Sequence, residues 1–304
     1  MASPAPLPSP VLILGLGWSG RVLAAQLQAR GVQVSGTVRD PSSTADDGLQ
    51  RYRLHADAAP SAALLEAIAQ AQAVLCSVPP DAQGDPALRQ LLPALQASPA
   101  LRWVGYLSST SVYADRGGGW VDENSEADAS ETAGVQRRLA ETQWRALADA
   151  RGIASAVFRL PGLYGLGRNA LLQLAERRAR HVVRPGVVFN RLHVEDLAAV
   201  VIAAMQRTTR DGLYLPADDE PAPPQDVLTY AARLGGFALP PAVAWDDPAV
   251  SATLRRFYAS SKRVDSRGTR EALAWAPKFA TYREGLEELA ASLAGHGPAL
   301  PRDV

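Results

Sequence analysis

Runs rich in apolar residues alternate with amphipathic stretches along the first half of the chain. Buried strands are expected at 11–15, 32–38, 73–78 and 102–109. The stretches between them repeat apolar residues at the spacing of a helix face, and helices are expected at 21–31, 61–72 and 86–96. Strands that alternate with helices in this way predict βαβ crossovers and a parallel sheet. The pattern therefore indicates an α/β protein.

The pattern continues and then loosens in the second half. An amphipathic helix is expected at 135–152 and a buried strand at 153–160. Beyond residue 165 the sequence predicts helices at 169–180, 194–206 and 282–295, and a proline-rich break at 216–226.

This change of pattern predicts two folded units. We expect a doubly wound Rossmann domain built from 11–165 and 187–215, and a smaller C-terminal substrate domain built from 166–186 and 216–295. Residues 1–10, with four prolines, predict a flexible tail, and residues 296–304 predict a frayed one.

Charge and composition narrow the function classes. Lys and Arg together number 31, as do Asp and Glu, so the chain lacks the positive charge typical of a nucleic-acid binder. Apolar residues make up 47% and charged residues 20%, as in globular domains, and no 18 apolar residues run uninterrupted. The N-terminus has no basic and apolar signal pattern. We expect a cytoplasmic protein that binds neither nucleic acid nor a membrane.

A glycine-rich turn joins the first expected strand to the first expected helix. In such a turn the first glycine permits the bend, the second lets the backbone approach a pyrophosphate, and the third allows close packing of helix on strand. The anion would lie on free amide groups at the helix start. We expect a dinucleotide to contact this turn and two residues at the same edge of the sheet: Gly15, Leu16, Gly17, Trp18, Ser19, Gly20, Ser77 and Pro161.

The end of the second strand bears on the choice of dinucleotide. Arg39 and Asp40 are adjacent there. An arginine at this place can meet the 2′-phosphate of NADP, whereas an acidic residue accepts from the ribose 2′-hydroxyl of NAD. The choice depends on where the strand ends. We expect Arg39 to contact NADP, with NAD as the alternative cofactor.

Several motifs resemble the extended short-chain dehydrogenase/reductase family, which includes nucleotide-sugar epimerases and dehydratases. Beside the glycine turn, the matching segments are RWVGYLSSTSVYAD (102–115), FRLPGLYGLGR (158–168), NRLHVEDLA (190–198) and SSKRVDSRGTREALAWAP (260–277). The resemblance is spread over about residues 11–290. It implies NAD(P)-dependent chemistry, and it assigns to Ser109 the polarisation of a substrate carbonyl.

The acid/base pair of that family is missing. The resemblance places a tyrosine about 25 residues after Ser109 and a lysine four residues further, and counting from Ser109 reaches Gly134 and Arg138. The chain has only two lysines, Lys262 and Lys278, so the nucleotide-binding half contains no YxxxK motif. Arginine stays protonated and cannot pass on a proton at neutral pH. The chain therefore resembles the atypical branch of the family, in which this pair is replaced.

Polar residues near the missing pair offer further candidates. Arg138 could hold a cofactor ribose or phosphate through its fork of donors, and it joins Ser109 as a candidate catalytic residue. Arg137 is expected to pair with Glu141 on a solvated helix face. His193, at a helix entrance, is expected to be structural rather than a general base.

Other chemistry finds less support. Neither an HExxH metal motif nor a GxSxG nucleophile elbow occurs, so no metal site and no serine hydrolase are expected. The dehydratases of the family have Asp-Glu where this chain has Thr110-Ser111, which disfavours dehydration. We expect packing roles for Tyr113, Trp120 and Cys76.

Two functions stay open. The first is an NADP-dependent oxidoreductase or epimerase of atypical mechanism, acting on a nucleotide-sugar-like or other carbonyl or hydroxyl small molecule with an unidentified proton donor. The second is a non-catalytic protein that signals NADP occupancy to a partner. Loss of the acid/base pair favours the second, whereas Ser109 and an apparent substrate domain favour the first, which we adopt. A homodimer is the default assembly.

Overall fold

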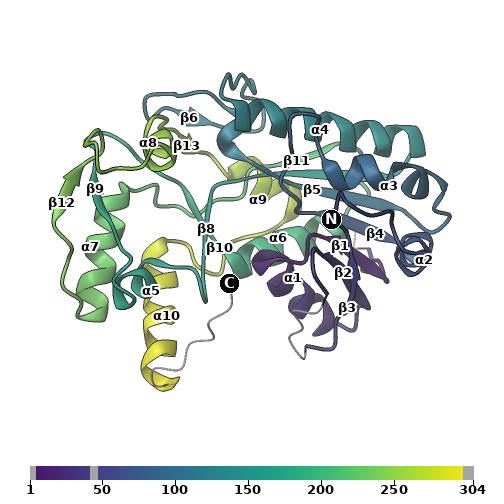
Figure 1. Ribbon diagram of the computed structural model, residues 1–304, viewed down its shortest axis with the longest axis horizontal. Coiled ribbons are helices and arrows are strands. Elements are labelled where there is room, and N and C mark those ends of the chain that lie inside the picture. The colour runs from purple at the N-terminus through teal and green to yellow at the C-terminus, as the bar shows by residue number, and fades with distance from the viewer. Residues whose placement is uncertain (1–4, 42–46, 297–304) are drawn as a thin grey trace.

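The fold is built on a seven-stranded sheet (Figure 1). The computed structural model of the chain describes residues 5–41 and 47–296. The strands are β1 Val11–Leu14, β2 Val34–Val38, β3 Gln50–Arg53, β4 Ala73–Cys76, β5 Trp103–Ser109, β7 Ala154–Leu160 and β11 Gly212–Tyr214. They lie in the order β11-β7-β5-β4-β1-β2-β3, and all neighbours are parallel. The expected doubly wound parallel sheet is confirmed.

The strand order reverses between β1 and β4. The chain builds β1, β2 and β3 outward in one direction and β4, β5, β7 and β11 in the other. Crossover connections on either side of such a reversal leave a crevice at the carboxyl ends of the strands. The glycine turn follows β1 directly, so it lies at this crevice.

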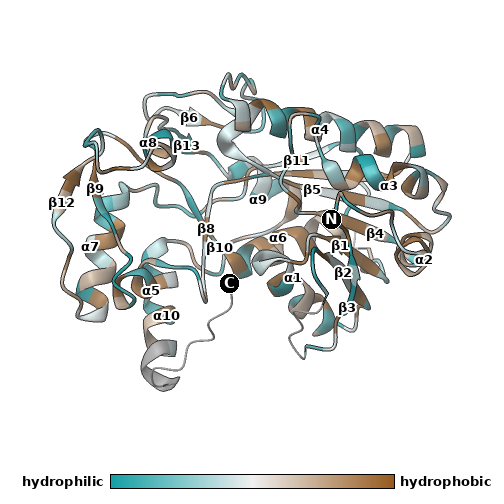
Figure 2. Cartoon of the chain, viewed as in Figure 1, coloured by the Kyte–Doolittle hydropathy of each residue, from teal (hydrophilic) through white to brown (hydrophobic). Residues whose placement is uncertain are grey.

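Helices cover both faces of the sheet. Helices α1 (Trp18–Gln28) and α6 (Val194–Met205) pack on one face, and α2 (Ala62–Gln70), α3 (Pro86–Ala97) and α4 (Thr132–Arg151) pack on the other. Strand β1 serves both cores, because Val11 and Ile13 face the first and Leu12 and Leu14 face the second. Figure 2 shows the central strands as largely apolar and the helices as mixed, which fits a sheet buried on two sides.

A smaller unit lies beside the sheet, at the left of Figure 1. Its core is formed by α5 (Ala170–Ala175), α7 (Pro224–Gly235) and α10 (Tyr282–His296). Strand β9 (His181–Val183) pairs with β12 (Ala242–Ala244), and α8 (Ala252–Tyr258) packs near them.

Two short parallel pairs and one helix join the two units. Strand β8 (Gly162–Tyr164) pairs with β10 (Arg191–His193), and β6 (Trp120–Val121) pairs with β13 (Arg263–Val264). A 3₁₀ turn, η1 (Thr110–Val112), follows β5, and α9 (Arg267–Leu273) follows β13. Leu273 at the end of α9 packs in the core of the large sheet, although the sequence assigns its segment to the smaller domain.

The N-terminal segment packs on the Rossmann domain. Residues 5–10 lie against the Rossmann domain, where Gln206 donates to the Ala5 carbonyl and Leu7 packs on the core. The expected tails at 1–4 and 297–304 lie outside the described residues. Within the described part of the chain, no helix combines the length and the apolar character needed to cross a membrane.

Four elements differ from the expectation. Helix α5 ends at Ala175 rather than at residue 180. Helix α1 begins at Trp18, inside the glycine motif, rather than at residue 21. Strand β3 has the polar sequence QRYR and sits at the sheet edge, so it lacks the apolar run of a buried strand. Helix α7 starts within the proline-rich break, because Pro223 and Pro224 occupy the N-cap and the first helical position, where a missing N–H has no cost.

Candidate functional site

The neighbouring strands hold the glycine turn from both sides. Gly15 donates its amide to Thr37 Oγ1 at 2.9 Å, and the Leu16 amide donates to the Thr37 carbonyl at 2.7 Å. From the end of β4, the Ser77 hydroxyl donates to the Gly15 carbonyl at 2.5 Å. The Ser77 side chain therefore stabilises the turn by binding the backbone of Gly15.

The three glycines of the turn have different reasons to be glycine. Gly15 has φ +87°, and Gly20 would bring a Cβ to 3.0 Å from the Gly15 carbonyl oxygen. Gly17 has an ordinary φ of −83°, and a Cβ there would meet no protein atom within 4 Å. Among the described glycines it alone has neither a positive φ nor a neighbour within that distance. Folding therefore does not require glycine at this position.

The start of α1 is suited to an anion. Gly17 is the N-cap, no side chain accepts from the first amides, and the first turn contains no acidic residue. The N–H groups of Trp18, Ser19 and Gly20 lie in the first turn, where an α-helix offers no carbonyl partner. Together with the helix dipole they form the kind of site that binds a pyrophosphate.

The loop after β8 lies against this helix start. Trp18 Nε1 donates to the Leu166 carbonyl at 2.8 Å, and the Arg168 guanidinium lies 5.3 Å from the centre of the Trp18 indole. Pro161, between β7 and β8, is half-buried at the same edge of the sheet. Sequence alone gave no sign that Trp18 joins the glycine turn to a segment about 150 residues away.

Arg39 is the first residue beyond β2. The strand ends at Val38, and both Arg39 and Asp40 are exposed. Since β2 lies next to β1, the Arg39 side chain starts from the strand end beside the glycine turn.

Ser109 is the last residue of β5 and is half-buried at the crevice edge. Its hydroxyl oxygen accepts from the Ser111 amide at 3.1 Å and so caps the η1 turn. This leaves the hydroxyl proton available as a donor to a substrate oxygen.

Helix α4 packs on the turn after Ser109 at Gly134, the residue at which the resemblance places the family tyrosine. A Cβ on the buried Gly134 would lie 2.2 Å from the Ser111 carbonyl oxygen and 2.5 Å from the Ala129 Cβ. The helix thus packs directly on the turn after Ser109, at a separation that admits no side chain. Arg138 is exposed, whereas Arg137 reaches inward and donates to the Leu107 carbonyl at 2.7 Å.

A comparison with known proteins agrees with this geometry. Residues 11–214 match the NAD dependent epimerase/dehydratase family. The chain belongs to this family. Its resemblance to short-chain dehydrogenases, inferred from the sequence motifs, is thereby confirmed.

Individual relatives span most of the chain. The structure of a functionally unknown conserved protein from Silicibacter pomeroyi is 38% identical, with a TM-score of 0.82 over 93% of this chain and 98% of that one. Protein YeeZ of Escherichia coli (strain K12) is 29% identical over 67% of this chain and 76% of its own length. UDP-glucuronic acid 4-epimerase from Bacillus cereus, in complex with NAD, shares the fold at 15% identity, with a TM-score of 0.73 over 96% and 99% of the two chains.

A buried ionic network lies behind Ser109 in this member of the family. Arg159 on β7 forms two hydrogen bonds with Glu141 on α4, at 3.1 and 2.8 Å, and both side chains are buried. Ser108 donates to Glu141 at 2.6 Å, and Arg159 also donates to the Tyr113 hydroxyl at 2.9 Å. The expected Arg137–Glu141 pair is therefore wrong, because Glu141 faces the sheet rather than solvent.

The other candidate proton donors have structural roles. Burial raises the pKa of Tyr113, whose hydroxyl donates to the Asp122 carbonyl. Burial lowers the pKa of His193 to about 4, so the ring is neutral at pH 7. His193 caps α6 by accepting from the Glu195 amide, and its ring packs 4.1 Å from that of Phe279. Cys76 is buried and donates to Asp85.

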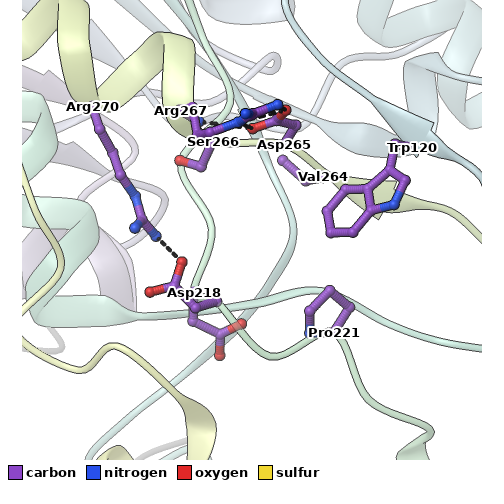
Figure 3. A pocket seen from close by; sticks show the side chains of 9 residues that line it. Trp120, Asp218, Pro221, Val264, Asp265, Ser266, Arg267 and Arg270 are labelled. Atoms are coloured by element: carbon purple, nitrogen blue, oxygen red, sulfur yellow. Dashed lines mark hydrogen bonds and ion pairs between the residues drawn. The ribbon is translucent and has the colours of Figure 1, made fainter.

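A cavity of about 490 Å³ lies beyond the carboxyl end of β11 (Figure 3). Two arginines of its lining form ion pairs, Arg270 with Asp219 at 2.7 Å and Arg267 with Asp265 at 2.5 Å, whereas the buried Asp218 forms no ion pair with any residue that the structure describes. The indole of Trp120 lies across the cavity from Arg270 and is 61% exposed, so the expected packing role is wrong for this residue. The lining includes neither the glycine turn nor Ser109.

We expect a tyrosine at the family position to destabilise this protein. Gly134→Tyr forces a side chain against the Ser111 carbonyl and should cost about 3 kcal/mol or more of unfolding free energy. Ala133→Tyr, on the exposed neighbouring position, is the control and should change stability by about 0.5 kcal/mol or less. Urea unfolding measures both, and equal stability of the two variants would contradict the close packing of α4.

The Glu141–Arg159 pair gives a second test. Glu141→Gln leaves the Arg159 charge buried without its counter-ion, and the unfolding free energy should fall by about 3–5 kcal/mol. Glu220→Gln, which breaks the partly exposed pair with Arg283, should cost about 1 kcal/mol or less. Thermal and urea unfolding of the two variants make the comparison, and a small loss in Glu141→Gln would show that the pair is not desolvated.

Proposed function

We propose that the protein is an NAD(P)-dependent oxidoreductase or epimerase that acts on a carbonyl or hydroxyl substrate with a proton donor other than the family tyrosine. The substrate is expected to be a nucleotide sugar or a related small molecule, bound between the Rossmann domain and the smaller domain. When bound, the nicotinamide accepts or returns a hydride.

Gly17 is the single observation that carries the proposal. Neither backbone conformation nor packing within the protein requires glycine there. A Cβ added to Gly17 would project into open space at the start of α1, where three backbone amides are uncapped. A pyrophosphate that approaches the backbone closely is the ligand that would require the missing side chain. The residues that would hold the cofactor are the turn from Gly15 to Gly20, Ser77 through its support of the turn, and Pro161.

Arg39 supports NADP over NAD in this proposal. It is the first side chain after β2, and its guanidinium can form charge-assisted hydrogen bonds with a 2′-phosphate. The family is described as NAD dependent, so NAD is the alternative cofactor.

Ser109 supports the chemistry on the substrate. Its oxygen is fixed by the Ser111 amide, which leaves the hydroxyl proton to donate to a carbonyl or alkoxide oxygen at the end of β5. Arg138 is exposed on α4, so contact with a cofactor phosphate would need a ligand that extends to that face.

One observation favours a second candidate, a non-catalytic NAD(P)-binding protein. Gly134, where the resemblance places the family tyrosine, packs too closely on Ser111 for any side chain, which supports a protein without the ordinary acid/base pair. In this case cofactor occupancy would act on a partner, and screening of carbonyl substrates would find no turnover.

Calorimetric titration with NADPH, NADP⁺, NADH and NAD⁺ tests the cofactor site. We expect the phosphorylated pair to bind more tightly. Gly17→Val should weaken binding of all four at least about tenfold, since the added side chain meets the ligand and not the protein. Because valine is a poorer N-cap than glycine, the unfolding free energy should fall by about 1 kcal/mol. Arg39→Ala should cost NADP(H) about 1.5–3 kcal/mol and leave NAD(H) unaffected.

Arg30→Ala is the matched control, because Arg30 follows the opposite end of α1 and is exposed. It should change none of the affinities. Binding that survives Gly17→Val, or the absence of binding to all four nucleotides, would overturn the proposed function.

A further inference from the structure

Lys262 contacts the η1 turn, on which Gly134 also packs. It comes from the segment before β13 and is one of only two lysines in the chain. Its ammonium donates to the Tyr113 carbonyl at 2.7 Å and to the Thr110 carbonyl at 3.5 Å. Thr110 directly follows Ser109, so the Lys262 amine reaches the same turn on which the expected carbonyl-polarising hydroxyl sits.

The backbone around Lys262 is held firmly. The Ser261 amide donates to Asp115 at 2.7 Å, and the Arg116 and Gly118 amides donate to the Ser261 carbonyl. Asn190 donates to the Lys262 carbonyl at 2.8 Å. The glycine-rich loop at 117–119 is therefore hydrogen-bonded to this segment. The same bonds fix the backbone from which the Lys262 side chain extends toward the end of β5.

No carboxylate of the described residues forms an ion pair with Lys262. Within the described part of the chain, the ion pairs formed by a lysine all belong to Lys278. The charged groups around Lys262 are Asp115, Arg116 and Asp128, and Arg116 is itself paired with Asp128 at 2.8 Å. Asp115 accepts from the Ser261 and Gly117 amides instead.

We propose that Lys262 is the proton donor and acceptor of this site, in place of the tyrosine that Gly134 excludes. The inference rests on the proposed function. An ammonium has three N–H groups, and the two carbonyls occupy two of them. The proposal assigns the third to a substrate oxygen held at Ser109, the residue that precedes Thr110.

The proton balance is complete with the cofactor class already proposed. In the oxidation direction, the neutral amine takes the proton of the substrate hydroxyl, and the O–H electron pair forms the second bond of the carbonyl. The C–H electron pair leaves with its hydrogen as the hydride that the oxidised nicotinamide accepts. In reduction, the ammonium returns the proton to the carbonyl oxygen.

The electrostatics of the site suit this role. Burial lowers the pKa of Lys262 to about 8, so both protonation states are accessible near neutral pH. Lys278 is exposed and paired with Glu195 and Glu288, and its pKa is raised. The chain thus contains its own reference lysine.

Nuclear magnetic resonance of protein labelled with ¹³C at lysine Cε tests the proposal directly, since two lysines give two signals. Lys278→Arg, an exposed substitution, assigns them. We expect Lys262 to titrate with a midpoint near 8 and Lys278 to titrate at a higher pH than a free lysine. NADP⁺ should lower the Lys262 midpoint, because a cationic nicotinamide ring nearby disfavours the ammonium, whereas NADPH should not.

The outcomes separate the inference from the proposed function. Nucleotide binding is measured by calorimetry on the same sample, and its absence overturns both. The inference is wrong if nucleotide binds but Lys262 stays charged at pH 10, or if NADP⁺ does not change the titration midpoint of the Lys262 signal. In either case the lysine only caps η1. For any carbonyl compound that the enzyme reduces, Lys262→Arg should lower kcat about 10²–10⁴-fold, although arginine can still donate to the η1 carbonyls. In the native protein kcat should depend on pH with a midpoint near 8, and this dependence should be lost in Lys262→Arg.

Discussion

The contact between α4 and the turn after β5 governs the rest of the site. Gly134 lets the helix approach the Ser111 carbonyl to a distance at which even a methyl group would overlap. This approach brings Glu141 toward the sheet, where Arg159 and Ser108 satisfy its carboxylate. The same packing removes the room for a tyrosine. A side chain at position 134 and this close packing of the helix exclude each other.

The cofactor side of the crevice retains what the family needs. Thr37 and Ser77 shape the glycine turn from the two adjacent strands, and the α1 amides are uncapped. These features depend only on the parallel sheet and on the first crossover. The substrate side depends instead on segments that arrive from the second half of the chain, such as 260–263 and the loop after β8. Changes in catalytic chemistry can therefore accumulate there without loss of the nucleotide scaffold.

Sequence patterns predicted the sheet and the place of the glycine turn, because both rest on local periodicity and on residues close together in the chain. They did not predict that Glu141 and Arg159 are buried together, since an amphipathic pattern identifies a helix face but not which polar side chain finds a partner inside. The sequence identified Lys262 as one of two lysines but did not predict its position in the fold. Its contacts with Thr110 and Tyr113 join residues about 150 positions apart, and no local pattern reports such a distance.

The hydrogen bond from Trp18 to Leu166 couples the two parts of the fold. The acceptor belongs to a loop that leads into α5 of the smaller unit, while the donor begins the helix that the nucleotide is expected to meet. Movement of that loop away from α1 must break a bond worth about 1 kcal/mol and separate Arg168 from the indole. A displacement of the smaller unit that moves this loop therefore acts on Trp18 directly, so the position of the smaller unit is coupled to the glycine turn through a single side chain.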